Sequence, residues 1–339
     1  MSEKKYTEEE LQQLSFRDQS LDLESRVADL LERMTLEEKL RIMRGYLGWK
    51  TKKVKRLGIE SFRTTDGPVG VARHSSYRKN TRFPTSILVS STWDPELALK
   101  LGEAMGEETR ATDRHCLLAP GINVHRTPLC GRTFEYFSED PYLIKEIASP
   151  IVKGIQKYKV AACVKHYVAN NQEHNRFSVN AVIDDRTLNE IYMKPFADVV
   201  KESDPWTIMA CYNQVNGEFG CENKHIMKEK LMEEFGFKGL VMSDWFATRK
   251  IESTAACVKA GLSLEMPRKM RYKKKKLLES IENGEITEQD IDFVVKRTLR
   301  VMFQVGLFDD PSTLPQCERN TEEHQALARE IATQGMVLL

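Results

Sequence analysis

The chain has 339 residues, of which 41% are hydrophobic and 30% charged, a composition typical of a globular protein with one large domain or two modest ones. Its 51 Lys and Arg residues balance 50 Asp and Glu residues to a net charge of +1, so no overall field favours nucleic acid. Residues 1–10 lack the apolar core of a signal peptide, and no apolar run approaches the about 18 residues of a membrane span. We therefore expect a cytoplasmic protein that binds neither nucleic acid nor membranes.

The sequence also lacks the usual patterns of metal and nucleotide sites. Its seven cysteines form no C-x-x-C pair, its histidines show no metal-ligand spacing, and it has no P-loop or G-x-G-x-x-G motif. Cys163 and Cys211 fall in predicted core strands, where cysteine behaves as a small hydrophobic residue. The basic cluster at residues 268–276 indicates a solvated helix start. We expect free thiols, no metal and no cofactor.

Four helix starts carry capping signals, in chain order. Thr35 opens a capping box with the acid three residues later. Asp94 and Asp140 each precede a proline, which combines an N-cap with a favoured first helical residue. Thr287 predicts a further helix, which should end before Gly306.

Three short uncharged runs predict strands that are buried on both faces, as in a parallel sheet. The runs cover residues 160–164, 207–211 and 239–242, and they are followed by Lys165 with His166, Tyr212 with Asn213, and Asp244. Ionisable groups at the carboxyl ends of successive parallel strands mark the face where (β/α)₈ barrels place their chemistry. We therefore expect an α/β fold with a TIM-like (β/α)₈ barrel of regular or irregular form.

Beyond Gly306 the pattern changes. Residues 307–319 predict an irregular linker, residues 321–333 have helical spacing, and residues 336–339 predict a strand that ends with the chain. Because a strand needs a partner, this arrangement suggests the first strand of a missing domain.

The residues that follow the strands leave two interpretations open. Asp244 beside Trp245 at a barrel mouth suits a nucleophile or an ion stabiliser for a sugar, but Asp is also a strong helix N-cap. Lys165 and His166 are either donors that reach a ligand or members of a structural salt bridge. A tight turn explains the Gly-Pro pair that follows Asp66, although it does not require the acid.

Two arginines lie among Pro, Gly and aromatic residues in the segment 123–141, namely Arg126 and Arg132. The guanidinium fork binds paired oxygens and is costly to bury without such a partner. The segment therefore predicts a binding loop.

Six segments carry a family pattern: residues 65–70 (TDGPVG), 131–141 (GRTFEYFSEDP), 165–176 (KHYVANNQEHNR), 212–217 (YNQVNG), 241–245 (VMSDW) and 264–267 (LEMP). In this order they resemble the N-terminal barrel of the two-domain β-glucosidases of glycoside hydrolase family 3. The resemblance covers roughly residues 25–339. It implies an N-terminal extension over residues 1–24, a barrel over 25–306, and a linker with the truncated start of an α/β sandwich domain over 307–339.

The resemblance also implies an activity and a role for each site residue. The activity is retaining hydrolysis of terminal non-reducing β-D-glucosyl residues, with a β-glucoside or related oligosaccharide as substrate. The implied roles are Asp244 as nucleophile; Asp66, Arg132, Lys165 and His166 as ligands of the sugar hydroxyls; Arg73 and Arg126 as supports; Tyr212 near the nucleophile or ring oxygen; and Trp245 as the sugar platform.

Two features depart from the family pattern. Ser263 stands where a polar acid or amide is usual. The family's general acid/base is a Glu of the sandwich domain, which this sequence lacks, and Glu173 is the one acid in the best-matched loop that could replace it, although its family role is structural. We therefore expect a nucleophile-bearing half that is weak or inactive alone and that needs a separate polypeptide or self-association. The alternative is a non-catalytic sugar-binding or assembly subunit.

Overall fold

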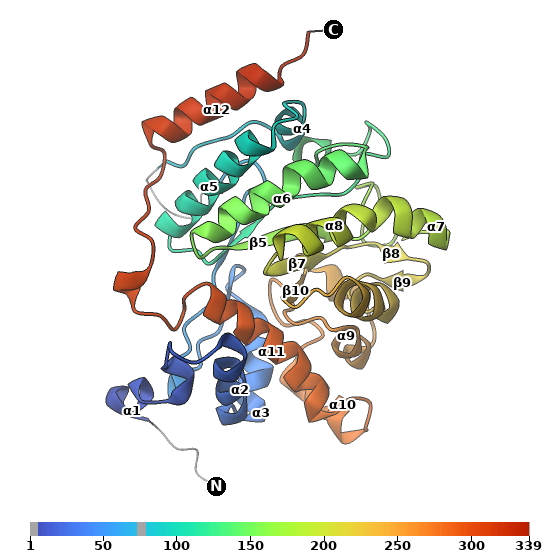
Figure 1. Ribbon diagram of the computed structural model, residues 1–339. Helices are drawn as coiled ribbons and strands as arrows, with labels where there is room; N and C mark the ends of the chain where they lie inside the picture. Colours follow the sequence, from blue (N-terminus) through green and yellow to red (C-terminus); the bar gives the residue numbers. More distant parts are fainter. Residues whose placement is uncertain (1–5, 73–78, 339) are drawn as a thin grey trace.

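The structure is a computed structural model that describes residues 6–72 and 79–338 (Figure 1). Arg73, one of the expected site residues, lies outside the described residues. No helix in the described ranges is both long and apolar enough to cross a bilayer. Helices and strands alternate along most of the chain, as the sequence predicts.

Five parallel strands form the central sheet, in the order β10-β7-β5-β4-β3. Their bounds are β3 Thr64–Asp66, β4 Cys116–Leu118, β5 Ala161–Tyr167, β7 Thr207–Ala210 and β10 Leu240–Ser243. The three predicted strands correspond to β5, β7 and β10, and all three are buried along their full length. Lys165 and His166 lie inside the last part of β5 rather than after it.

The sheet curls, and its two edges meet through short irregular segments. An antiparallel hairpin, β1 (Gly45–Tyr46) with β2 (Lys50–Thr51), fills the gap between β10 and β3. Single backbone bridges join the parts: Met242 with Leu264, Arg44 with Glu265, and Lys50 with Arg63. The fold is therefore a TIM-like barrel of irregular form, which confirms the predicted fold class.

Helices cover the outside of the sheet. Figure 1 shows α5 (Pro95–Ala111), α6 (Pro141–Lys157) and α8 (Lys194–Ser203) side by side on one flank, while α11 (Glu288–Gln304) lies against α2 (Leu23–Arg33) on another. The contact between α5 and α6 is close, because a Cβ added at Gly102 would stand 2.4 Å from the carbonyl oxygen of Ile151. The glycine therefore allows the two helix backbones to touch.

The predicted caps are present at all four helix starts. Thr35, Asp94, Asp140 and Thr287 each accept a hydrogen bond from a backbone N–H of the first turn that follows. Gly306 has a φ of 75°, the left-handed conformation that ends helices. These ends were predictable because capping depends on neighbouring residues alone.

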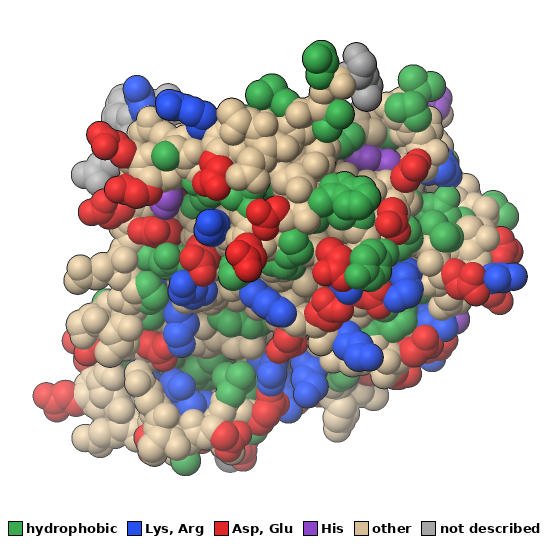
Figure 2. Space-filling model, turned by 45° about the horizontal axis from the view of Figure 1, so that its top comes forward, with side chains coloured by type: hydrophobic (Ala, Val, Ile, Leu, Met, Phe, Trp, Pro, Cys, Tyr) green, Lys and Arg blue, Asp and Glu red, His purple; other side chains and the backbone are tan. Residues whose placement is uncertain are grey.

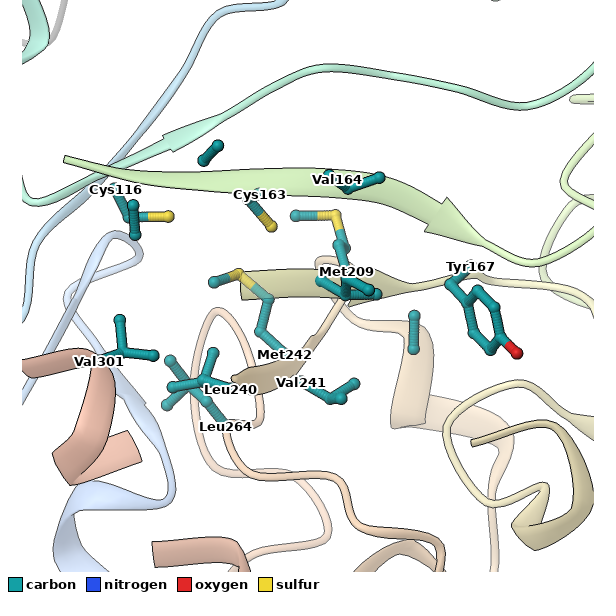
Figure 3. Close-up of a cluster of buried hydrophobic side chains, with 14 of the residues drawn as sticks. Cys116, Cys163, Val164, Tyr167, Met209, Leu240, Val241, Met242, Leu264 and Val301 are labelled. Atoms are coloured by element: carbon teal, nitrogen blue, oxygen red, sulfur yellow. The ribbon is translucent and has the colours of Figure 1, made fainter. Parts of the chain in front are cut away.

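The barrel interior is filled by small and sulfur-containing side chains. Figure 3 shows Cys163, Met209, Met242 and Leu240 between the strands, with Val301 of α11 beside them. All of them are buried. Cys163 therefore packs as a small hydrophobic residue, as predicted, and all seven cysteines are free.

The C-terminal segment differs in part from the prediction. Residues 307–319 are irregular apart from the short η7 (Pro311–Thr313), and α12 (Glu322–Gly335) packs against α4 (Ser86–Ser90) and α5. The predicted strand at residues 336–339 is wrong over its described part, because Met336, Val337 and Leu338 are 65%, 69% and 100% exposed and pair with no described strand. The division into residues 1–24, 25–306 and 307–339 stays a prediction.

Smaller elements complete the chain. Strands β6, β8 and β9 form a separate sheet beside the barrel. The remaining bounds are α1 Glu8–Gln12, η1 Ser15–Arg17, α3 Leu36–Ile42, η2 Lys55–Leu57, η3 Thr133–Glu135, β6 Asn180–Ala181, α7 Asp185–Thr187, η4 Leu188–Tyr192, β8 Gln214–Val215, β9 Glu218–Phe219, η5 His225–Glu234, η6 Ala247–Lys250, α9 Thr254–Ala260 and α10 Lys274–Glu282.

Candidate active site

Asp244 follows β10 directly and is 6% exposed. Its Oδ1 accepts a hydrogen bond of 2.6 Å from the backbone N–H of Trp245. The N-cap position of the following helix η6 is Phe246, so Asp244 caps no helix. Its other oxygen, Oδ2, is buried and accepts no hydrogen bond from the described residues. The carboxylate therefore keeps one oxygen free, and the capping interpretation does not hold.

Two nitrogen groups face the free oxygen of Asp244. His166 Nε2 lies 3.5 Å from Oδ2, and Arg132 Nη1 lies 3.8 Å from it. Asn123 fixes the backbone of His166 on both sides: its Oδ1 accepts from the backbone N–H at 2.7 Å, and its Nδ2 donates to the carbonyl oxygen at 2.9 Å. Tyr136 places its hydroxyl 3.0 Å from His166 Nδ1.

Burial, together with the positive charges of Arg132 and Lys165, holds the pKa of His166 well below its usual value. The ring is therefore neutral at pH 7 and has one N–H to donate. A neutral imidazole beside Asp244 suits a hydrogen-bond donor to a bound hydroxyl or to the carboxylate itself.

Lys165 joins two acids at the mouth of the barrel. Its Nζ lies 3.2 Å from Asp66 Oδ1 and 3.5 Å from Glu135 Oε2, and its side chain is almost fully buried. Burial alone would lower the pKa of Lys165, but the charges of Asp66 and Glu135 raise it. Burial would likewise raise the pKa of Asp66, but Lys165 lowers it. The lysine and the Asp66 carboxylate are therefore both ionised, and Asp66 keeps half of its side chain exposed to the cleft.

Glu135 is a site residue that the sequence analysis did not assign. It is buried, pairs with both Lys165 and Arg132, and thereby fixes the two cations relative to each other. Arg132 Nη1 also lies 4.0 Å from Glu173 Oε1. Although burial alone would lower the pKa of Arg132, neighbouring Tyr136 and Glu135 raise it. The sequence signal that could have identified Glu135 was its position inside the family segment 131–141.

The pKa of Asp244 reflects two opposing effects. Burial raises it, whereas Arg132, Tyr212, the Trp245 N–H and Lys165 lower it, and the net shift is upward. The cations therefore offset part of the effect of burial and favour the anionic form of the carboxylate.

Aromatic rings border the carboxylate. Tyr212 interacts with Asp244, and its ring lies 4.5 Å from that of Phe177. Trp245 lies 5.0 Å from Trp49, ring centre to ring centre. The structure therefore brings Tyr212 and Trp245 to the expected place beside Asp244.

Arg126 is not brought to this cluster. Its side chain is exposed, and its Nη2 donates to Gln172 Oε1 at 3.4 Å. No recorded contact joins it to Asp66 or Asp244, so its role as a support stays a prediction.

A cleft of about 530 Å³ is bordered by Asp66 and Arg132. Arg132, which lies 3.8 Å from Asp244 Oδ2, connects the cleft to that carboxylate, whereas the described wall does not include Asp244, Lys165, His166, Tyr212 or Trp245. The walls of the cleft include Asp66, Arg132, Glu135, Glu173 and Arg176, together with residues 67–72 and 80–82. A cleft of this size accommodates a sugar ring. Within residues 6–72 and 79–338, no cluster of His, Cys, Asp and Glu side chains has the arrangement of a metal site.

Comparisons with known proteins agree with this geometry. Residues 11–301 match the model of the "Glycosyl hydrolase family 3 N terminal domain". The chain therefore belongs to glycosyl hydrolase family 3. It is 40% identical over 322 residues to thermostable beta-glucosidase B of Acetivibrio thermocellus, covering 92% of this chain and 42% of that protein. It is 41% identical over 319 residues to beta-glucosidase B of Emericella nidulans, covering 93% of this chain and 37% of that protein.

The fold is also similar to solved members of the family. Beta-glucosidase 3B from Thermotoga neapolitana, solved in complex with glucose, superposes with a TM-score of 0.85 at 38% identity, covering 92% of this chain and 47% of that chain. The beta-glucosidase from Kluyveromyces marxianus, also solved with glucose, gives a TM-score of 0.84 at 36% identity, covering 91% and 38%. The chain therefore spans less than half the length of the relatives it matches.

Proposed function

We propose that this chain is the nucleophile-bearing barrel of a retaining β-glucosidase. The observation that carries the proposal is Asp244, a buried carboxylate at a strand end whose Oδ2 has no hydrogen-bond partner among the described residues and faces His166 and Arg132. A carboxylate in this position attacks the anomeric carbon of a sugar in the cleft. The bond to the leaving oxygen breaks as the bond to Oδ2 forms.

The other residues hold the sugar. Asp66 accepts from the sugar hydroxyls, Lys165 donates to them, and the His166 N–H adds a further donor. Arg132 and Lys165 favour the anionic form of Asp244, and this negative charge stabilises the sugar ring as it becomes oxocarbenium-like. The glucose complexes of two relatives and the β-glucosidase names of others support terminal β-D-glucosyl residues as the substrate.

The general acid/base is proposed to come from another domain or chain. Retaining hydrolysis needs a second carboxyl group about 5 Å from the first to protonate the leaving oxygen and then activate water. Glu173 fits this role poorly, because its Oε2 accepts from Arg176 Nη1 at 2.6 Å and its Oε1 faces Arg132. Loss of general acid/base help typically reduces rates by roughly 10²–10⁴. The chain alone should therefore turn over ordinary glucosides slowly or not at all.

An apolar groove supports the proposal of a partner. Ile87 and Trp93 line a groove of about 550 Å³ together with Pro128, Phe137 and Leu143. Trp93 is 76% exposed, and nearby Leu129 is 90% exposed. On the face in Figure 2, hydrophobic side chains alternate with charged ones. Such a surface suits a partner that supplies the acid/base, or a second copy of the chain.

Covalent labelling tests the proposal. A 2-deoxy-2-fluoro-β-glucoside with a dinitrophenolate leaving group needs no acid to depart, so it should slowly label Asp244 even without the acid/base. Peptide mapping of the adduct identifies the residue, and Asp244→Asn is the control that should stay unlabelled. An adduct at another carboxylate would refute the assignment.

A second candidate is a non-catalytic sugar-binding or assembly subunit with the same cleft. It is favoured by the constrained Glu173, since the cleft then contains no acid free to protonate a leaving group. Under this alternative the protein binds glucose but forms no adduct with the fluorosugar. Both interpretations include a cytoplasmic location, which stays a prediction.

A further inference from the structure

Glu108, on α5, lies outside the site described above but is fully buried. Its carboxylate joins two other parts of the chain. Oε2 accepts from the backbone N–H of Thr81 at 2.9 Å, and Oε1 accepts from the backbone N–H of Asn320 at 2.8 Å. Oε1 also lies 3.0 Å from His324 Nδ1 on α12. A buried carboxylate with this many donors is strongly fixed in place.

Thr81 belongs to the wall of the sugar cleft. Residues 80–82 line the cleft together with Asp66 and Arg132. The Phe83 N–H donates to the carbonyl oxygen of Val69 at 3.1 Å, which ties this segment to the loop that begins at Asp66. The fixed Thr81 backbone therefore sets the position of the loop that follows Asp66.

The two segments also touch through Gly70. A Cβ added there would stand 2.4 Å from the carbonyl oxygen of Thr81, and the φ of Gly70 is 111°. Contact this close means that a shift of Thr81 is transmitted to residues 66–72 rather than absorbed by empty space.

His324 supplies the positive partner of the cluster. The side chain is buried, and its Nε2 lies 3.4 Å from Glu107 Oε2. Its backbone N–H belongs to the first turn of α12 and donates to the side chain of Thr321. The hydrogen bond with Glu108 and the nearby charges of Glu108 and Glu107 raise its pKa, although burial opposes them. The histidine thus fastens α12 to α5 through the same carboxylate that holds the cleft wall.

We propose that Glu108 is a positioning residue for the sugar cleft and that α12, through His324, sets the affinity of the cleft for sugar. The proposal rests on the proposed function, because it takes the cleft as the sugar site. When α12 detaches, Glu108 loses its cation and Asn320, and residues 80–82 of the cleft wall loosen. The loop that follows Asp66 then needs to be ordered by the sugar itself, which weakens binding.

The experiment compares Glu108→Gln and His324→Gln with the control Glu103→Gln. Glu103 also lies on α5, but its carboxylate pairs with Lys157 of α6, and no contact within the described residues joins it to Thr81 or His324. Two quantities are measured well below the melting temperature: amide hydrogen exchange of residues 80–83, and the dissociation constant for glucose by calorimetry. We expect the first two variants to exchange these amides about tenfold faster and to bind glucose about five- to tenfold more weakly. The control should change either quantity less than about twofold.

The outcomes separate this proposal from the proposed function. Unchanged exchange at residues 80–83 overturns the positioning role, and faster exchange with unchanged glucose affinity overturns the control of affinity by α12. If amide exchange accelerates equally at residues 80–83 and in β7, the protein is destabilised as a whole, and this result also overturns the positioning role. If Glu108→Gln does not fold, His324→Gln carries the test, since it leaves the buried carboxylate intact. If the unaltered chain binds no glucose, the proposed function fails, while exchange still decides whether Glu108 fixes the wall.

Discussion

His166 Nε2 and Asp244 Oδ2 face each other at 3.5 Å, and both side chains are almost completely buried. The pKa of the histidine is well below its usual value, so the ring is neutral. The Tyr136 hydroxyl lies 3.0 Å from Nδ1 and 3.4 Å from the carbonyl oxygen of Asn170. When its proton is donated to Nδ1, the ring proton lies on Nε2 and points at the carboxylate. This tautomer supports the anion, whereas the other would place a lone pair against it.

Removal of this donor should slow covalent labelling. We expect His166→Ala to reduce the rate of fluorosugar labelling by about 10- to 100-fold, because a hydrogen bond from His166 to the bound sugar or to the carboxylate in the labelling reaction would contribute about 1.5–3 kcal/mol. His174→Ala is a suitable control, since His174 is exposed and belongs to the same segment. Equal rates for the two variants would contradict the role of His166.

The Lys165 ion pairs should dominate the stability of the barrel mouth. Lys165→Met removes one of the two cations that pair with buried Glu135 and leaves Arg132 as the other, and we expect the free energy of unfolding to fall by about 1–3 kcal/mol. Urea denaturation measures this loss. Lys157→Met removes an exposed pair with Glu103 and should change the unfolding free energy by less than about 1 kcal/mol. A loss no larger than that of the control would show that Lys165 is dispensable for the fold.

The attachment of α12 should depend on pH. The pKa of His324 is raised by its hydrogen bond with Glu108 and by the charges of Glu108 and Glu107, while Glu323 is the nearby acid on α12 itself. A group with a raised folded pKa stabilises fully below its unfolded pKa of about 6.5 and loses this effect as pH rises through the folded value. Amide exchange in α12 should therefore accelerate at alkaline pH.

The same pH series on His324→Gln provides the control. In this variant the rate of amide exchange in α12 should rise with pH only as the intrinsic exchange rate does, with no additional step at alkaline pH. A step of equal size in both proteins would assign the pH dependence to another group.

Close contact at Gly70 should make it intolerant of a side chain. Gly70→Ala places a methyl group against the Thr81 carbonyl at a φ of 111°, whereas Gly217 has a φ of 101° and no atom within 4 Å of an added Cβ. Gly217→Ala therefore measures the backbone penalty alone. We expect Gly70→Ala to cost about 1–3 kcal/mol more in unfolding free energy than the control. Equal losses of unfolding free energy in the two variants would show that the Thr81 segment shifts to make room for the methyl group.

Local signals in the sequence predicted much of the fold. The caps at Thr35, Asp94, Asp140 and Thr287 depend on residues within one helical turn, and the strand that leads to Asp244 is visible as an uncharged run. Neighbouring residues in the sequence are therefore enough to predict helix ends and buried strands. The meeting of Asp66, Lys165 and Asp244 follows once the strands are taken as parallel.

Other features depend on contacts between distant residues. The bond between Glu108 and His324 joins positions 216 residues apart, and neither residue belongs to a pattern that indicates it. Glu135 was visible in a motif, but its position between two cations depends on how the loop folds. The strand predicted at residues 336–339 is wrong over Met336–Leu338, because residues that favour strands still need a neighbouring strand with which to pair.

The neighbouring indole rings of Trp49 and Trp245, tilted by 44° to each other, give the protein an optical property at its candidate site. One ring belongs to the residue directly after Asp244, and the two centres are 5.0 Å apart. Indole emission responds to the polarity and contacts of the ring, so a sugar on Trp245, as the proposed function has it, would change the emission. Intrinsic fluorescence therefore offers a direct signal of occupancy, even for a chain that turns over no substrate.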